Sequence, residues 1–541
     1  MTWHQQSRPK PATSKRISRI GRVLLYSIGA LTVLLIVGYF IANSMIRKKV
    51  DEALQALPPS MKVTYSSLHP NLLSRSLVID GLEILFAPET DSKQPHRHEI
   101  SIDRVTLGGI HFFAILRSHH LDLHSIRVES VNANLDEYLL EKNIPLPKIQ
   151  APFTDALIDR VELTNLTVTT HKGEKNNLSL DGGLELDSVH ITNHGGPGDT
   201  VQIGGIRFLV KNMRYTIPDA DEAVHVSNLE LDSKKRLLRL DTLRITPTMA
   251  QEEIGRVKGQ QVDVVEATSE GIAIEGLEVM ALMQHRLTAD LISVRHNSIH
   301  VFRDRRLPLA PGEKAMPMES LKTLSMTLRV KKVKIGSTFF AYEEFPRKGD
   351  KTGVMKIYRL TGAMEPLINK PVEGDPAYIT MTTEGSLMNS GTVSATTKMP
   401  LRKGDPYKVD GAFHELDVTK LNDPAENLGK LHLESGMLNS LTFQFEMTNE
   451  KATGKIVGEY HNLIVDKLKE NSNDVKVDKT KSFALKKFII PKDKDKSLPE
   501  KDRTGKVENK RVPERYFSYY LLHSLLVGVK SSFKLGFLLP G

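Results

Sequence analysis

The chain has 541 residues, a formal net charge of +9 and no cysteine. Its hydrophobic content of 40% is too high for a disordered chain and too low for a polytopic membrane protein. The missing cysteines exclude disulfides, cysteine-ligated zinc or iron–sulfur sites and a thiol nucleophile. A basic balance would suit a nucleic-acid-binding protein, so the position of the charges along the chain decides what they mean.

The amino terminus predicts a membrane anchor. Residues 1–22 carry Lys and Arg but no acid, and residues 23–46 carry no charge at all. As a helix, the uncharged stretch would span roughly 36 Å, enough for a hydrocarbon core of ~30 Å. It is longer than the apolar part of a cleaved signal peptide, which has about 7–15 residues. The positive-inside rule then predicts a cytoplasmic tail (1–22), a single transmembrane helix (23–46) and a main body outside the cytoplasm.

A recurrent spacing follows the anchor: apolar residues at i, i+2, i+5 and i+7, with a mostly polar pair in the middle. Apolar residues two apart share one face of a strand, and the middle pair shifts the phase by one residue. The pair is therefore either a bulge that restores the same face or a two-residue hairpin turn. We favour bulges for most copies, and the candidates for turns are the glycine-containing pairs Asp80-Gly81, Gly204-Gly205 and Glu275-Gly276. The ten copies begin at Leu77, Ile100, Leu121, Val161, Leu184, Val201, Val224, Leu238, Ile272 and Leu328.

The pattern predicts a mainly β fold, in which residues 47–465 form a repetitive β-rich body with short helices at Phe112–His120 and Leu135–Leu140. Two architectures fit: a sandwich whose strands bury a closed core, or one long curled sheet with an open, groove-like apolar face. The periodicity does not choose between them. In the second case the candidate lining residues are Leu77, Ile79, Leu82, Ile84, Ile100, Ile102, Leu184, Leu186, Leu238, Leu240, Ile272, Ile274, Leu328 and Val330.

The carboxy-terminal third changes character twice. Plain alternation predicts a half-buried strand through Leu441, Phe443, Phe445 and Met447. Residues 466–511 hold 15 Lys/Arg against 9 Asp/Glu and read as a charged, solvated or disordered linker. Residues 512–541 form an amphipathic segment whose uncharged part is too short to cross a bilayer; it either lies at an interface or docks on the sheet.

No catalytic chemistry is evident in the sequence. Phosphate-binding, serine-hydrolase and zinc-protease motifs are missing. His296 and His300 share a strand face, but no third ligand accompanies them, so we expect no metal site and no cofactor. Tyr342-Glu343-Glu344 reads as a solvated strand edge. With no catalytic constellation we expect no enzyme. Outside residues 1–22 and 466–511 the charge is slightly negative, so we expect no nucleic-acid-binding protein.

The arrangement resembles the AsmA-like family of Gram-negative envelope proteins, relatives of TamB. An amino-terminal anchor precedes short strands such as LVIDGLEI (Leu77–Ile84), and LHLESGMLNSLTFQF (Leu431–Phe445) is followed by GKIVGEYHNLIV (Gly454–Val465). The resemblance covers roughly residues 20–465. It implies a single-pass inner-membrane protein, mostly periplasmic, with a curled β-groove that carries phospholipid to the outer membrane. The alternative is a non-enzymatic assembly scaffold that binds outer-membrane or periplasmic proteins through strand edges.

Overall fold

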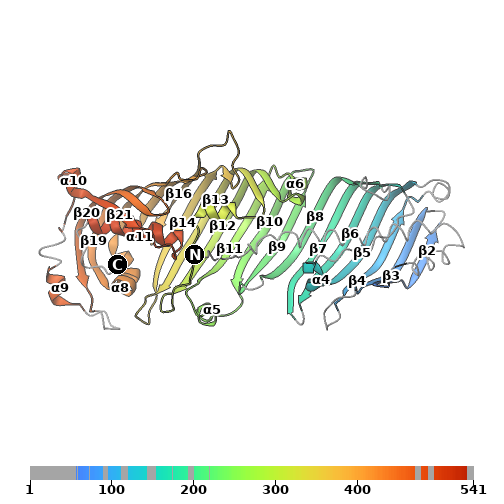
Figure 1. Cartoon of the computed structure of the whole chain (residues 1–541), viewed down its shortest axis with the longest axis horizontal. Helices are drawn as coiled ribbons and strands as arrows, with labels where there is room; N and C mark the ends of the chain where they lie inside the picture. Colours follow the sequence, from blue (N-terminus) through green and yellow to red (C-terminus); the bar gives the residue numbers. More distant parts are fainter. Residues whose placement is uncertain are drawn as a thin grey trace, which may run out of the picture. The chain divides into compact units, whose positions relative to one another are not determined.

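The computed structural model describes Leu57 and residues 59–532, with gaps at 72–73, 89–95, 111–119, 143–153, 173–174, 193–199, 218–219, 470–476, 485–490 and 492. These residues form 21 strands of a mixed sheet with short helices, which confirms the mainly β class (Figure 1). The expected tail and anchor (1–46) lie outside them. Within the described ranges, no helix has the length and apolar character needed to cross a membrane.

The chain divides into two compact units, and the first comprises Met1–Thr242 with Gly276–His285. Successive strands pair antiparallel, except for the parallel pair β5–β6; β1 and β2 follow one another along the same edge of β3. The elements are β1 (Met61–Thr64), β2 (Ser67–Asn71), β3 (Ser76–Phe86), β4 (His98–Gly108), β5 (His120–Asp136), α4 (Glu137–Lys142), β6 (Asp155–Lys172), β7 (Lys175–Thr192), β8 (Thr200–Ile217), β9 (Glu222–Asp232) and α6 (Val279–Met283). Strand β10 (Leu237–Pro247) is divided between the two units.

The second unit comprises Leu243–Glu275 and Arg286–Gly541. Its strands also pair antiparallel except for the parallel pair β12–β13. Its elements are α5 (Gln251–Lys258), β11 (Asp263–Glu275), β12 (Arg286–Asp304), α7 (Pro317–Lys322), β13 (Thr327–Phe345), β14 (Gly353–Glu365), β15 (Leu367–Ile368), β16 (Tyr378–Leu387), β17 (Gly391–Pro400), β18 (Tyr407–Asp417), η2 (Val418–Leu421), α8 (Asn422–Gly429), β19 (Leu431–Met447), β20 (Lys451–Lys467), α9 (Lys479–Ala484), α10 (Glu500–Arg503), β21 (Thr504–Lys510) and α11 (Phe517–Ser532).

In both parallel pairs, the segment that connects the two strands contains a helix. A parallel pair cannot be joined by a tight turn and needs a connection of about a dozen residues or more. Helix α4 lies in the connection from β5 to β6, and α7 lies in the connection from β12 to β13. The helix predicted at Leu135–Leu140 is α4, which begins two residues later because Leu135 and Asp136 still belong to β5. Of the helix predicted at Phe112–His120, the described part is His120, which begins β5.

In β3, β4 and β6 the doubled middle pairs of the repeat are bulges that line up across neighbouring strands. Between β3 and β6, Gly81, Asp103, Ser130 and Asn165 lie opposite one another at the level where each strand shifts phase. Three of the four have positive φ, which is a left-handed backbone. Because every strand shifts at the same level, the ladder continues on both sides of the row. The apolar positions before and after it therefore stay on one face.

The burial of β3 shows the result most clearly. Leu77, Ile79, Leu82 and Ile84 are all buried, although the spacing changes parity between the second and the third. A second row, with His124, Asp159, Ser188 and Gly204, repeats the arrangement across β5–β8.

The glycine pairs do not form hairpins. Asp80-Gly81 and Gly204-Gly205 lie inside β3 and β8, so the turn interpretation is wrong for them. Glu275-Gly276 ends β11 and leads to α6 instead. Gly81 supplies a positive φ within a bulge, which has the same local requirement as a primed turn. The spacing alone could not separate these two uses of glycine.

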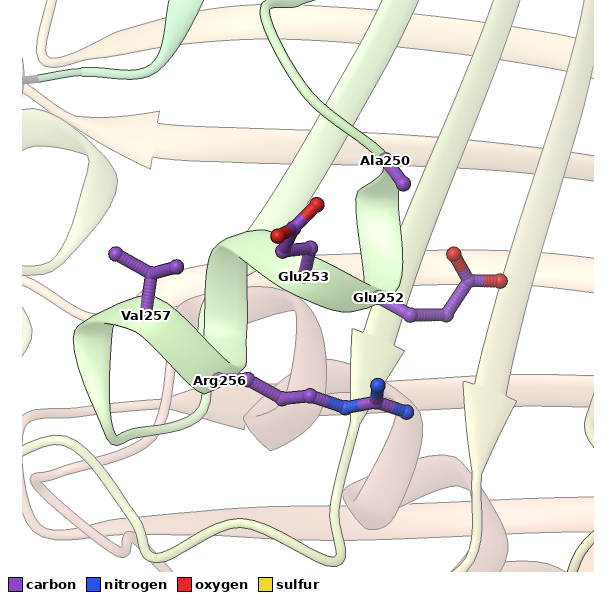
Figure 2. A pocket seen from close by; sticks show the side chains of 5 residues that line it. All are labelled: Ala250, Glu252, Glu253, Arg256 and Val257. Atoms are coloured by element: carbon purple, nitrogen blue, oxygen red, sulfur yellow. The ribbon is translucent and has the colours of Figure 1, made fainter.

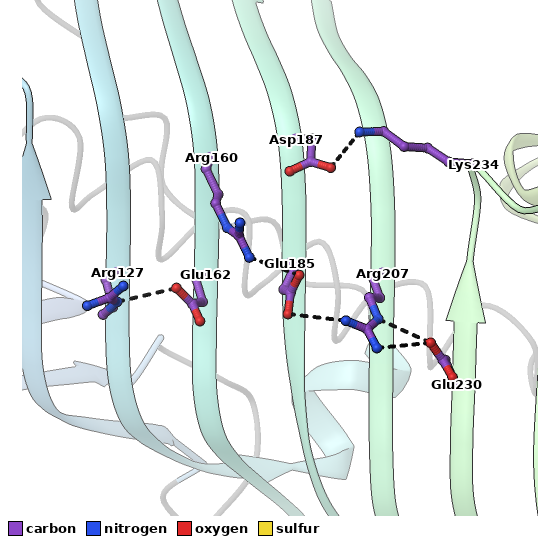
Figure 3. A network of polar contacts seen from close by, with 8 residues as sticks. All are labelled: Arg127, Arg160, Glu162, Glu185, Asp187, Arg207, Glu230 and Lys234. Atoms are coloured by element: carbon purple, nitrogen blue, oxygen red, sulfur yellow. Dashed lines mark hydrogen bonds and ion pairs between the residues drawn. The ribbon is translucent and has the colours of Figure 1, made fainter.

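Charged side chains cover part of the polar face of the first unit. Arg160 on β6 donates to Glu185 on β7 at 3.2 Å, and Arg207 on β8 donates to Glu230 on β9 at 3.0 Å (Figure 3). Arg207 also lies 3.8 Å from Glu185, so the contacts continue from strand to strand. Opposite charges facing each other across strands favour this register, each by about 0.2–1 kcal/mol.

The carboxy-terminal part of the second unit has its own apolar core. The predicted alternation of β19 is confirmed: Leu441, Phe443, Phe445 and Met447 are buried, with exposed residues between them. Helix α11 packs on β20 and β21, so the amphipathic segment docks on the sheet over Phe517–Ser532. A Cβ atom added at Gly505 would lie 2.2 Å from the carbonyl oxygen of Gly528, so glycine permits this close approach.

The expected linker 466–511 is partly ordered sheet. Residues 504–510 form β21, which pairs antiparallel with β20, so the linker interpretation is wrong there. The hydrophobic pattern of the sequence does not predict this strand, because Val507 is the one apolar residue in it. Burial nevertheless alternates, with Gly505, Val507 and Asn509 buried and Lys506, Glu508 and Lys510 exposed.

The left-handed bulge positions can be tested at Asn165, whose φ is +51° and whose side chain is exposed. A β-branched residue is strained in this conformation, so Asn165→Val is expected to lower the free energy of unfolding of the first unit by about 1–2 kcal/mol. Asn132→Val is the matched control, because Asn132 is exposed in the adjacent strand β5 without a positive φ. Urea unfolding followed by circular dichroism would measure both; equal effects would contradict the bulge assignment.

Candidate functional site

One apolar face of the second unit is left partly exposed. Strands β11–β14 carry apolar side chains that belong to none of the buried clusters and are partly exposed. Among them Ile335 is 37% exposed. We call this surface the open apolar face; it consists of Val265, Ile272, Ile274, Ile292, Val294, Ile299, Val301, Val333, Ile335, Phe340 and Leu360.

Strand register places these side chains in rows across the sheet. Ile272 on β11 pairs with Val294 on β12, which pairs with Ile335 on β13. The next row towards the carboxyl end of β11 is Ile274, Ile292 and Val333. Paired residues in neighbouring strands have Cβ atoms about 4.5–5.5 Å apart, so each row is a continuous apolar strip.

A bulge row divides the face, as in the first unit. Gly271, Arg295 and Gly336 lie opposite one another there, and Gly271 has a positive φ. A Cβ atom at Gly336 would lie 2.1 Å from the carbonyl oxygen of Arg295, so a larger residue would separate β12 from β13. Beyond this bulge row the apolar strip resumes with Ile299 and Phe340.

A polar row lies next to the bulge. Ser269 donates to Oδ1 of Asn297 at 2.8 Å, and Nδ2 of Asn297 donates to Thr338 at 3.0 Å. The Thr338 hydroxyl donates to the carbonyl oxygen of Gly336 at 3.0 Å. The donors and acceptors satisfy one another, so the row interrupts the apolar face without leaving these polar groups to be desolvated at full cost.

A charged row ends the face beyond Val265, Val301 and Tyr342. In register, Asp263 lies opposite Arg303, and Arg303 lies opposite Glu344. Arg303 donates from Nε and from a terminal nitrogen to the two carboxylate oxygens of Asp263, both at 2.6 Å. Burial opposes the charge of Arg303, but the adjacent Asp263 carboxylate raises its pKa above the ordinary value.

Glu344 is the second acid of this row. It accepts hydrogen bonds from Arg305 at 2.9 Å and from the Tyr342 hydroxyl at 2.7 Å. Burial and the nearby carboxylate raise the pKa of Tyr342, so the hydroxyl keeps its proton and acts as a donor. The prediction of a solvated edge here is wrong for Glu344, which is buried.

The predicted lining residues fall into two groups. Those of the first group lie in the buried cluster of the first unit, as the closed-core alternative requires: Leu77, Ile79, Leu82, Ile84, Ile102, Leu184 and Leu186. Ile100, Leu238, Leu240, Ile272, Ile274 and Leu328 are partly exposed, and Val330 is buried. Of the fourteen, the structure places Ile272 and Ile274 on the open apolar face.

Sequence reasoning missed the charged and polar rows. A signal was present, because Asp263 and Arg303 each stand two residues from an apolar residue of the face, at the same side-chain alternation, and Glu344 stands four residues from Phe340. A charged residue at a position on the apolar face of a strand is expected to form an ion pair when it is buried. What the sequence could not give is which charges meet, since they come from three strands.

Two other candidates carry less chemistry. A surface hollow beside α5 is lined by Ala250, Glu252, Glu253, Arg256 and Val257, and its charged side chains do not converge (Figure 2). His300 lies 3.0 Å from Glu343, whereas His296 is exposed. Among the described residues, no group of three potential ligands is arranged to hold a metal ion.

Comparison with known proteins gives no relative to guide the assignment. No family model matches the chain, and no curated protein is significantly similar to it in sequence.

The Asp263–Arg303 pair can be tested by a double-mutant cycle. Arg303→Met alone leaves the Asp263 carboxylate without its partner and is expected to cost about 3–5 kcal/mol of unfolding free energy. The double variant Arg303→Met with Asp263→Leu should recover most of this loss, because no unpaired charge remains. Urea unfolding of the four proteins gives the coupling; additive effects would show that the two side chains do not interact.

Proposed function

We propose that this chain is a membrane-anchored, non-enzymatic protein that binds or conducts phospholipid along the open apolar face. In this proposal residues 23–46 anchor it in the inner membrane and the body lies in the periplasm, serving lipid transport to the outer membrane and envelope homeostasis. The groove-like curvature of the sheet implied by the family resemblance belongs to the same proposal.

The observation that carries the proposal is the open apolar face itself. Strands β11–β13, with Leu360 of β14, present Ile, Val, Leu and Phe side chains that belong to none of the described cores. At β14 the rows reach Ile357 and Met364, which pack against the core of the second unit. Monomeric soluble proteins rarely expose large contiguous apolar patches unless a ligand, a partner or a membrane covers them. An acyl chain lying on such rows would gain ~0.8 kcal/mol for each CH₂ group removed from water.

The assembly-scaffold alternative would use a strand edge. In the described part of the chain, β21 pairs with β20 alone, and on its other edge the backbone amide of Lys506 donates to Oγ of Ser531 in α11 at 2.9 Å. That strand exposes Lys506, Glu508 and Lys510. Charged side chains on a short edge strand are a common device against strand addition. This observation favours the apolar face over the edge.

The test compares two substitutions that place an acid at an exposed apolar position. Ile335→Asp puts a charge in the middle of the open apolar face and should lower phospholipid affinity at least about 10-fold, the loss expected from removing one apolar side chain and adding an unpaired charge. Val257→Asp is the control, because Val257 is 67% exposed on α5, away from the face. Native mass spectrometry of the detergent-solubilised full chain would count bound phospholipid.

A third variant separates lining from core. Leu77→Asp introduces a charge into the buried cluster of the first unit and is expected to unfold that unit, whereas Ile335→Asp should remain folded by circular dichroism. If the wild-type protein carries no phospholipid, or if Ile335→Asp binds as much as Val257→Asp, the proposed function is wrong.

A further inference from the structure

The charged row that ends the open apolar face, taken together with the neighbouring Arg305 and Arg515, has more cations than acids. Arg303, Arg305 and Arg515 contribute three guanidinium groups, and the two carboxylates beside them are Asp263 and Glu344. Arg303 is 4% exposed and Arg515 is 5% exposed, so most of this charge is out of contact with water. Buried charges are normally paired, because an unpaired one loses its hydration without compensation.

Arg515 is the cation without an acid. Among the described residues its contacts are a hydrogen bond of 3.3 Å to Oε1 of Gln261 and a position 4.7 Å above the ring of Tyr519. Neither neighbour is a carboxylate, and no ion pair to Arg515 occurs in that part of the chain. Burial and then the charges of Arg305, Arg303 and Arg347 lower the pKa of Arg515, with Tyr519 acting in the opposite direction.

Arg305 lies next to it with an unused donor. One terminal nitrogen donates to Glu344, but Nε is buried and has no hydrogen-bond partner. A buried donor left unsatisfied is uncommon in folded proteins. The side chain of Arg305 as a whole is 23% exposed although its Nε is buried, so Arg305 is the member of the cluster that is accessible to an incoming group.

The position of the cluster relative to the apolar face is set by strand register. Arg303 is two residues beyond Val301 and on the same side of β12, about 7 Å further along the strand. The apolar rows are therefore followed along the sheet by the charged cluster, of which Arg303 and Arg515 are buried. This order, apolar side chains followed by cations, matches a molecule with an acyl chain at one end and an anion at the other.

We propose that Arg305 and Arg515, supported by Arg303, bind the phosphate of a phospholipid whose acyl chain lies on the open apolar face. Guanidinium groups match phosphate oxygens in planar, charge-assisted hydrogen bonds, and the added anion balances the excess cation. This inference rests on the proposed lipid function and adds to it the chemical class of headgroup and its place on the fold.

The test uses two ligands with identical tails, dioctanoyl phosphatidylglycerol and dioctanoylglycerol, of which the first alone has a phosphate. Native mass spectrometry of the detergent-solubilised full chain is expected to give an affinity at least about 10-fold higher for the phosphate-bearing lipid. Arg515→Gln and Arg305→Gln should each remove most of this difference and leave dioctanoylglycerol binding unchanged. Arg244→Gln, at an exposed arginine of β10, is the matched control.

The possible results separate the headgroup site from the lipid function. Equal affinity for the two ligands, unchanged in the variants, would overturn the phosphate site and leave lipid binding intact. Absence of binding by both ligands would overturn the proposed function as well. If inorganic phosphate binds as tightly as the lipid, the claim that the bound phosphate belongs to a phospholipid is wrong. If the arginines are merely structural, Arg515→Gln should lower the melting temperature and both affinities together; the phosphate site predicts an unchanged or higher melting temperature without ligand.

Discussion

The fold depends on keeping apolar side chains on one face while every strand changes phase. Side chains alternate along a strand, so a single added residue would turn all later apolar positions towards water. Here neighbouring strands add their residue at the same level, as Gly81, Asp103, Ser130 and Asn165 do in β3–β6. The hydrogen-bond ladder then resumes in register beyond the row. The buried cluster, the open face and the charged row all require this alignment.

The same template has two outcomes in the two units. In the first unit the apolar positions are dominated by Leu, Ile and Val, and Leu139 and Leu140 of α4 are buried with them. In the second unit the rows across β11–β14 also contain small and polar residues, such as Ala267, Gly362 and Thr338. On β11–β13 the apolar members of these rows, such as Ile299, Ile335 and Phe340, belong to none of the buried clusters. The template therefore sets which face is apolar, while the surroundings set whether it is covered.

The polar groups on the apolar face of the second unit are paired with one another. Ser269, Asn297 and Thr338 hydrogen-bond to one another, which keeps their polar atoms occupied within the apolar face. Arg303 and Asp263 pair at the end of the strands, where a charge marks the limit of the apolar rows. The surface thus has a direction, from apolar rows to charge, although the sheet beneath it is regular.

The sequence by itself determined the strands and their apolar faces, because side-chain alternation is a local property of the backbone. It indicated Leu77–Ile84 and Leu441–Met447 correctly for that reason. It missed β21, whose alternation is between glycine, asparagine and charged residues, and it could not tell the bulge at Gly81 from a turn. Only the tertiary structure decided which apolar rows are covered and brought Arg515 near Arg303 and Arg305. These contacts join segments far apart in the chain, and no local spacing encodes the pairing of distant segments.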